Sequence, residues 1–106
     1  MRNFLGISES EMVIISELGM RREKNIDTPE KKIKGISKMS LMRNIFRNQG
    51  ILMGYVLIFN NVKRLEDMGI VEVRKIGRET KVFITEKGFI IYKDIKQLKE
   101  DIKKGD

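Results

Sequence analysis

Apolar residues in the first part of this chain return at every third or fourth position, the spacing of a helix with one buried face. They are Met12, Ile15 and Leu18, with Ile14 close to the same face. Ser8 precedes them and Glu11 lies three residues further on, which is the arrangement of an N-terminal capping box. We therefore expect a core helix from Ser8 to about Gly19, and the pattern leaves open an extension to Lys24.

The polar segment from 25 to 35 contains the only proline of the chain. Thr28 is a suitable N-cap, Pro29 suits the first helical position, and Glu30 places an acid in the first turn. A short helix that ends at Gly35 and a basic loop are both compatible with this pattern.

A second helix is predicted from Lys38 to about Asn48. Ser37 is a good N-cap for it, and Gln49 with Gly50 ends it. Its expected apolar side consists of Met39, Met42, Ile45 and Phe46. We interpret the methionines at 39, 42, 53 and 68 as core filler, with a ligand pocket as the alternative.

A third helix is predicted from about Gly54 to Met68, with Gly69 as its C-cap. Ile58, Val62 and Leu65 lie at positions i, i+4 and i+7 and form its inward stripe. The polar residues between them are expected to point largely outward. They are Asn60, Asn61, Lys63 and Arg64.

From 70 to 85 the period changes to two, which is typical of strands. Val71 and Val73 alternate with polar residues in the first strand, which runs from Ile70 to Ile76. In the second strand, from Thr80 to Thr85, Val82 and Ile84 alternate with Lys81 and Phe83. The turn between the strands is Gly77-Arg78-Glu79.

A last helix, capped by Thr85, carries a heptad-like stripe. Its residues, spaced by 4, 3 and 4, are Ile91, Ile95, Leu98 and Ile102. The stripe serves either a second subunit or the chain's own domain, and we favour dimerisation because it projects beyond the hairpin with little core left to cover.

Composition and charge indicate which class of partner the protein binds. The 106 residues fit a single domain over 1–106, and the net charge of +7 favours an anionic partner, with nucleic acid first and an acidic membrane surface second. From Lys31 to Leu65 the sequence has no acidic residue, although the chain holds 15 acids. A central strip without carboxylates is what a surface facing phosphates needs, because each carboxylate would repel the DNA backbone.

The same composition argues against other functions. The chain contains neither Cys nor His, so we expect no metal site, no catalytic residues, no cofactor and no enzymatic activity. The longest apolar run, from Gly50 to Phe59, is too short to cross a bilayer, and no signal peptide is visible. We expect a cytoplasmic protein without membrane association. Frequent Ile, Lys and Glu also fit a thermophile.

The segment from Ser37 to Gly88 resembles winged helix-turn-helix transcriptional regulators, broadly of the MarR, ArsR and PadR kind. The resemblance rests on Lys63-Arg64-Leu65-Glu66-Asp67-Met68-Gly69-Ile70-Val71 and on Phe83-Ile84-Thr85-Glu86-Lys87-Gly88, with a Gly-Arg turn between them. It covers about half of the chain and implies an α+β, mostly helical fold. A helix-turn-helix would occupy 37–69, a wing 70–85, and a C-terminal, dimerising helix 86–104.

The resemblance also implies a site for double-stranded DNA and a homodimer that regulates transcription. The recognition helix would contribute Tyr55, Leu57, Asn60, Asn61, Lys63 and Arg64. The preceding helix would contribute Ser37, Lys38, Arg43 and Arg47. The wing would contribute Arg74, Lys75, Arg78 and Lys81, with Arg78 a candidate for the minor groove. Asn60 and Asn61 are candidates for base edges, since an amide can bind adenine at two atoms.

One feature departs from the family's pattern. The start of the recognition helix, from Ile51 to Leu57, is far more apolar than in the family, which has Ser or Thr there. Such side chains could contact thymine methyl groups, pack against residues 28–36, or meet a partner chain. The alternative function is therefore a winged-helix module for protein–protein interaction.

Overall fold

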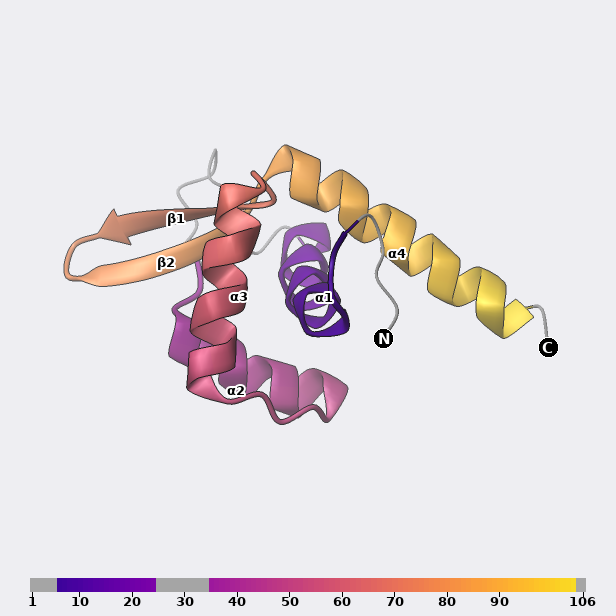
Figure 1. The fold of residues 1–106 in the computed structure, drawn as a ribbon, viewed down its shortest axis with the longest axis horizontal. Coiled ribbons are helices and arrows are strands. Elements are labelled where there is room, and N and C mark those ends of the chain that lie inside the picture. Colours follow the sequence, from indigo (N-terminus) through magenta and orange to yellow (C-terminus); the bar gives the residue numbers. More distant parts are fainter. Residues whose placement is uncertain (1–5, 25–34, 105–106) are drawn as a thin grey trace.

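Four helices and one antiparallel hairpin make up the described chain, which comprises residues 6–24 and 35–104 of a computed structural model (Figure 1). The elements are α1 (Glu9–Glu23), α2 (Lys38–Gln49), α3 (Tyr55–Asp67), β1 (Val71–Ile76), β2 (Glu79–Ile84) and α4 (Glu86–Lys104). Their order confirms the predicted α+β, mostly helical fold. The helix considered at Thr28 to Gly35 falls mainly outside the described residues.

Side chains cap three of the helices as predicted. The Ser8 N–H donates to Glu11 Oε1 at 2.8 Å while the Glu11 N–H donates to Ser8 Oγ at 3.3 Å, which completes the capping box of α1. Ser37 Oγ accepts from the Ser40 N–H at 3.2 Å, and Thr85 Oγ1 accepts from the Gly88 N–H at 3.0 Å. Each bond satisfies a donor that the first helical turn leaves unpaired.

The end of α3 sets the direction of β1. Gly69, one residue after the C-cap Met68, has a φ of +76°, where a side chain would be strained. The Gly69 N–H donates to the Glu66 carbonyl at 3.0 Å and the Ile70 N–H to the Leu65 carbonyl at 2.9 Å. This pair of bonds is a Schellman motif, and it turns the chain directly from α3 into the hairpin.

In the hairpin, Val71 lies opposite Ile84 and Val73 opposite Val82. The turn is shorter than expected, because Glu79 already pairs with Ile76 and only Gly77 and Arg78 remain between the strands. Phe83, which alternates with Val82 and Ile84 along β2, is buried as well. Its ring is 1% exposed and packs where a Cβ on Gly35 would come within 2.8 Å of it.

A short β-bridge next to the hairpin explains this burial. Ile36 and Val82 exchange two backbone hydrogen bonds, of 3.1 and 2.8 Å, so that the chain before α2 lies along β2. Gly35, the residue before the bridge, is thereby held against the Phe83 ring.

The core lies between the helices and the base of the hairpin. Its fully buried residues include Ile14, Ile15, Leu18, Leu41, Ile45, Ile58, Leu65 and Ile70. The expected apolar side of α2 is partly wrong. Leu41 and Ile45 face the core, whereas Met39 and Phe46 are 42% and 57% exposed.

α4 packs mainly against α1 and then extends away from the other elements (Figure 1). The Tyr92 ring lies directly over Gly19, where a Cβ would come within 2.1 Å of Tyr92 Cγ. The Tyr92 hydroxyl donates to Glu23 Oε1 at 3.1 Å, and Lys96 Nζ lies 2.9 Å from Glu23 Oε2. The bond to Lys96 lowers the pKa of Glu23, while burial raises the pKa of Tyr92.

Candidate nucleic-acid interface

The outer face of α3 carries three residues one helical turn apart. Val56, Asn60 and Lys63 stand at positions i, i+4 and i+7, opposite the buried stripe of Ile58, Val62 and Leu65. Asn60 and Lys63 are exposed, as predicted, and make no hydrogen bond or ion pair with another described residue. Val56 is 72% exposed and was not among the predicted site residues.

The beginning of α3 is apolar and exposed. Its N-cap, Gly54, provides no side-chain hydrogen bond. Around it lie exposed side chains that we call the apolar end of α3: Leu52 (83% exposed), Tyr55 (45%), Val56 (72%), Leu57 (45%) and Phe59 (44%). Tyr55 and Leu57, both predicted site residues, therefore reach solvent on the flanks of Val56.

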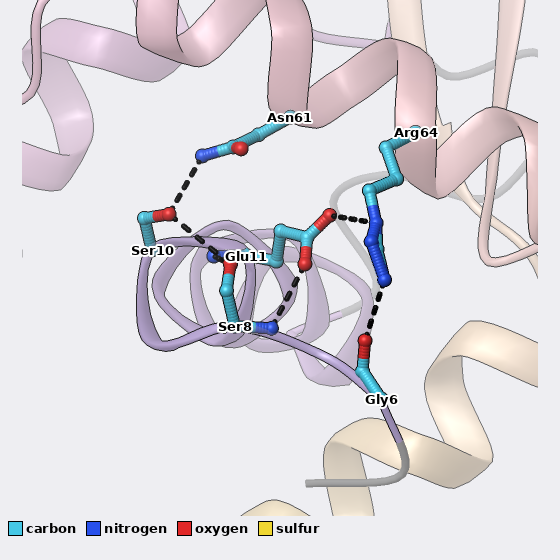
Figure 2. A network of polar contacts seen from close by, with 6 residues as sticks. All are labelled: Gly6, Ser8, Ser10, Glu11, Asn61 and Arg64. Atoms are coloured by element: carbon cyan, nitrogen blue, oxygen red, sulfur yellow. Dashed lines mark hydrogen bonds and ion pairs between the residues drawn. The ribbon is translucent and has the colours of Figure 1, made fainter. Parts of the chain in front are cut away.

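The expected outward orientation of Asn61 is wrong. Its side chain is 9% exposed, and its Nδ2 donates to Ser10 Oγ of α1 at 2.9 Å (Figure 2). Asn61 follows Ile58 by three residues and precedes Leu65 by four, so helical geometry turns it toward α1.

Arg64 is half exposed, but its guanidinium is directed at the start of α1 (Figure 2). Its Nη2 donates to the Gly6 carbonyl at 2.6 Å, and its Nε lies 3.2 Å from the buried Glu11 carboxylate. Glu11 thus serves both the capping box of α1 and the attachment of α3. Arg64 holds the helix in place, which the sequence pattern did not predict.

Of the four predicted residues on and before α2, two present unpaired positive charges. Arg43 and Arg47 are exposed and form no ion pair with a described residue. Lys38 lies over the Phe59 ring at 4.3 Å from its centroid, and this cation–π contact places its charge beside α3. Ser37 remains the cap of α2, with its hydroxyl bonded to Ser40.

Of the four predicted wing residues, two are likewise unpaired within the described part of the chain and two are paired with acids. Lys75 and Arg78 are exposed and unpaired among the described residues, with Arg78 at the tip of the hairpin. Arg74 pairs with Glu72 and lies over the Phe83 ring, 5.7 Å from its centroid. Lys81 is 17% exposed and its Nζ lies 2.7 Å from Glu79 Oε2. Lys75 and Arg78 are thus the wing's unneutralised cations.

The predicted dimerisation stripe is buried in its first part and exposed further along α4. Ile91 and Ile95 are 9% and 2% exposed and belong to the chain's own core, so their assignment to a subunit interface is wrong. Leu98 is 46% exposed, beyond the part of α4 that α1 covers. The side chain of Ile102 lies outside the described part of the structure.

The described elements define a winged helix-turn-helix. α2 and α3 are the helix-turn-helix, α1 supports both from behind, and the hairpin of β1 and β2 extends beside α3 as the wing (Figure 1). In the described ranges, 6–24 and 35–104, no helix is long and apolar enough to span a membrane.

Solved structures share this fold, although no family model and no curated protein matches the chain. F93 from STIV, described as a winged-helix DNA-binding protein, is 16% identical, with a TM-score of 0.71 over 88% of this chain and 89% of that one. AF1382 from Archaeoglobus fulgidus is 16% identical, with a TM-score of 0.67 over 92% of both chains. SSV1 F-93 is 21% identical, with a TM-score of 0.62 over 91% of both. At these identities the likeness establishes the fold.

Proposed function

We propose that this protein binds double-stranded DNA, with α3 in the major groove and the hairpin tip at the adjacent minor groove. The observation that carries the proposal is the outward Asn60 and Lys63 of α3, together with exposed Arg43 and Arg47 on the preceding helix and Arg78 at the hairpin tip, none of which pairs with a described residue. Residues 35–65 contain no carboxylate that would repel a phosphate backbone. The description of F93 from STIV as a DNA-binding protein supports the same assignment.

Each exposed residue has a distinct expected role. Asn60 would bind a base edge, while Lys63 and the two arginines of α2 would contact phosphates and set the register. Asn61 and Arg64 act indirectly, because they fix the orientation of α3 on α1. Glu66 and Asp67, at the far end of α3, would repel phosphates. We therefore expect the first two-thirds of the helix, and not its end, to face the DNA.

The general test is a gel shift with random duplex DNA across a salt series. We expect retardation at low salt and a logarithmic affinity that falls steeply with salt, by about 0.9 per phosphate neutralised. Absence of retardation at low salt would instead favour an interaction module for another protein. The exposed Leu52 and Val56 are the observation that supports this second candidate function.

Charge reversal at the wing tip tests the wing directly. We expect Arg78→Glu to weaken binding to all duplexes by roughly tenfold or more at 0.1 M salt, because one phosphate or groove contact is lost and a repulsion is added. Lys99→Glu is the matched control, since it makes the same change in net charge. Lys99 lies in the last part of α4, the helix that extends away from α3 and the wing (Figure 1). Equal affinities of the two variants would remove the wing from the interface.

We further propose that the protein acts as a homodimer and regulates transcription. The stripe of Ile91 and Ile95 continues to Leu98, where it leaves the chain's own core and becomes exposed. Two copies joined at this end of α4 would place their recognition helices in successive major grooves, about 34 Å apart, on a near-palindromic site.

The dimer has its own test. Leu98→Glu is expected to convert a dimer into a monomer in sedimentation, because it places a charge in the proposed interface while the residue is half exposed in the single chain. This substitution is better suited than truncation at Thr85, which would remove Ile91 and Ile95 from the core. Lys99→Glu, one residue away, controls for charge, because it lowers the net charge by one unit more than Leu98→Glu does and keeps the Leu98 side chain. A wild-type chain that sediments as a monomer contradicts the proposal.

A further inference from the structure

The apolar end of α3 is exposed at the part of the helix that enters the groove in the proposed function. Val56 occupies the same outward line as Asn60 and Lys63, Leu57 follows it on α3, and the exposed Leu52 precedes the helix. Exposed apolar side chains that gather on one surface commonly mark a binding site. No described element covers Val56 or Leu52, so the core does not account for them.

The major groove offers one apolar group to such side chains. Among the four base-pair orientations only those with thymine present a methyl group, the C5-methyl, while the other groups there are hydrogen-bond donors and acceptors. An amide such as Asn60 suits adenine, which presents an acceptor and a donor side by side. The same outward line therefore combines a group suited to thymine with one suited to adenine.

We propose that the apolar end of α3, and Val56 in particular, reads thymine methyl groups, so that the preferred duplex contains a thymine close to the adenine bound by Asn60. This inference rests on the proposed function and specifies its substrate class. Val56 and Asn60 are one turn apart, about 6 Å along the helix axis. With α3 along the groove, the thymine and the adenine lie roughly two base pairs apart at a rise of 3.4 Å per pair.

Charge favours DNA over a protein as the occupant of this surface. Lys38 lies beside Phe59 at 4.3 Å, Arg43 lies on the neighbouring helix, and Lys63 continues the outward line. Residues 35–65 contain no carboxylate, and the nearest acids on α3, Glu66 and Asp67, follow Lys63 at the far end of the helix. An apolar strip with a cationic rim fits a groove whose floor bears methyl groups and whose edges are phosphates.

Uracil substitution tests the inference with the full-length chain. Duplexes are first selected from a random pool by binding, and the tightest is remade with deoxyuridine in place of each thymidine in turn, which removes only the methyl group. We expect at least one position where affinity falls about fourfold, the typical effect of one buried methyl group. That position should lie about two base pairs from an adenine whose replacement also weakens binding.

Two variants test whether the loss of affinity on uracil substitution depends on Val56. In Val56→Ala the ratio of thymine to uracil affinity is expected to fall toward one at that position. Ile90→Ala, an equally simple truncation of a 54% exposed residue on α4, should leave the ratio unchanged.

Salt-dependent binding with a ratio near one at every thymine overturns the inference but leaves DNA binding intact. Selected duplexes without thymine, or a ratio that persists in Val56→Ala, also overturn the inference. Failure to bind any duplex at low salt overturns both, and the apolar end of α3 would then be a surface for another protein.

Discussion

The Lys63→Glu variant is expected to bind every duplex on the order of fiftyfold more weakly than the unaltered protein at 0.1 M salt. With a slope of about 0.9 per phosphate, one phosphate contact makes binding about eightfold tighter at 0.1 M salt than at 1 M salt, so its loss lowers the affinity at 0.1 M by about that factor. The new carboxylate adds a repulsion of similar size. Lys63 is suited to this role because it is exposed on the outer face of α3 and pairs with no other described residue.

The measurement is a fluorescence titration of a labelled duplex at several salt concentrations between about 50 and 200 mM. The slope of log affinity against log salt should become shallower by about one or two units in Lys63→Glu. Lys99→Glu should keep the slope of the unaltered protein apart from a small effect of net charge. If both variants bind alike, α3 does not face the DNA backbone through Lys63, and the proposed orientation of the helix is wrong.

Local signals predicted the elements of this protein well. The capping residues Ser8, Ser37 and Thr85 form their bonds within the next few residues, so the sequence alone contains both partners. The alternation of Val71, Val73, Val82 and Ile84 likewise predicted the hairpin. These features depend on neighbours in sequence, and the fold follows from their order.

The orientation of polar residues was harder to predict, because polarity is a weak guide to direction. Asn61 lies on the buried side by helical spacing, and it is tolerated there because Ser10 accepts its hydrogen bond. Ser10 lies 51 positions away in sequence, so no local pattern reveals the pair. Arg64 bonds Gly6 and Glu11 for the same kind of reason.

Apolar residues raised the opposite difficulty. The apolar stretch from Ile51 to Leu57 predicted thymine contacts as one alternative but did not distinguish Val56 from its neighbours, although Val56 lies four residues before Asn60 on the same helix face. The stripe of Ile91 and Ile95, spaced by 4, fits an intramolecular and an intermolecular partner equally, and the expectation that little core remained for it favoured a second subunit. Only the position of α1 beneath α4 distinguishes the two.

The contact between Gly19 and Tyr92 leads to the largest expected effect on stability. We expect Gly19→Ala to lower the free energy of unfolding by roughly 3 kcal/mol, the upper part of the usual range for overpacking. The new Cβ would stand 2.1 Å from Tyr92 Cγ, at the rigid base of the ring. This clash outweighs the gain of about 1 kcal/mol that alanine brings to a helix interior. Denaturant unfolding measures the difference.

A second background separates the clash from the helix effect. In a Tyr92→Ala protein the ring is absent, so adding Gly19→Ala is expected to stabilise by about 0.5–1 kcal/mol, and the sign of the effect reverses. An equal cost in both backgrounds would mean that α4 does not cross α1 at Gly19. The crossing matters beyond stability, because Tyr92 and the Glu23–Lys96 pair set the angle at which α4 leaves the domain. In the proposed dimer that angle determines the separation of the two α3 helices, and hence the spacing of the half-sites they can reach.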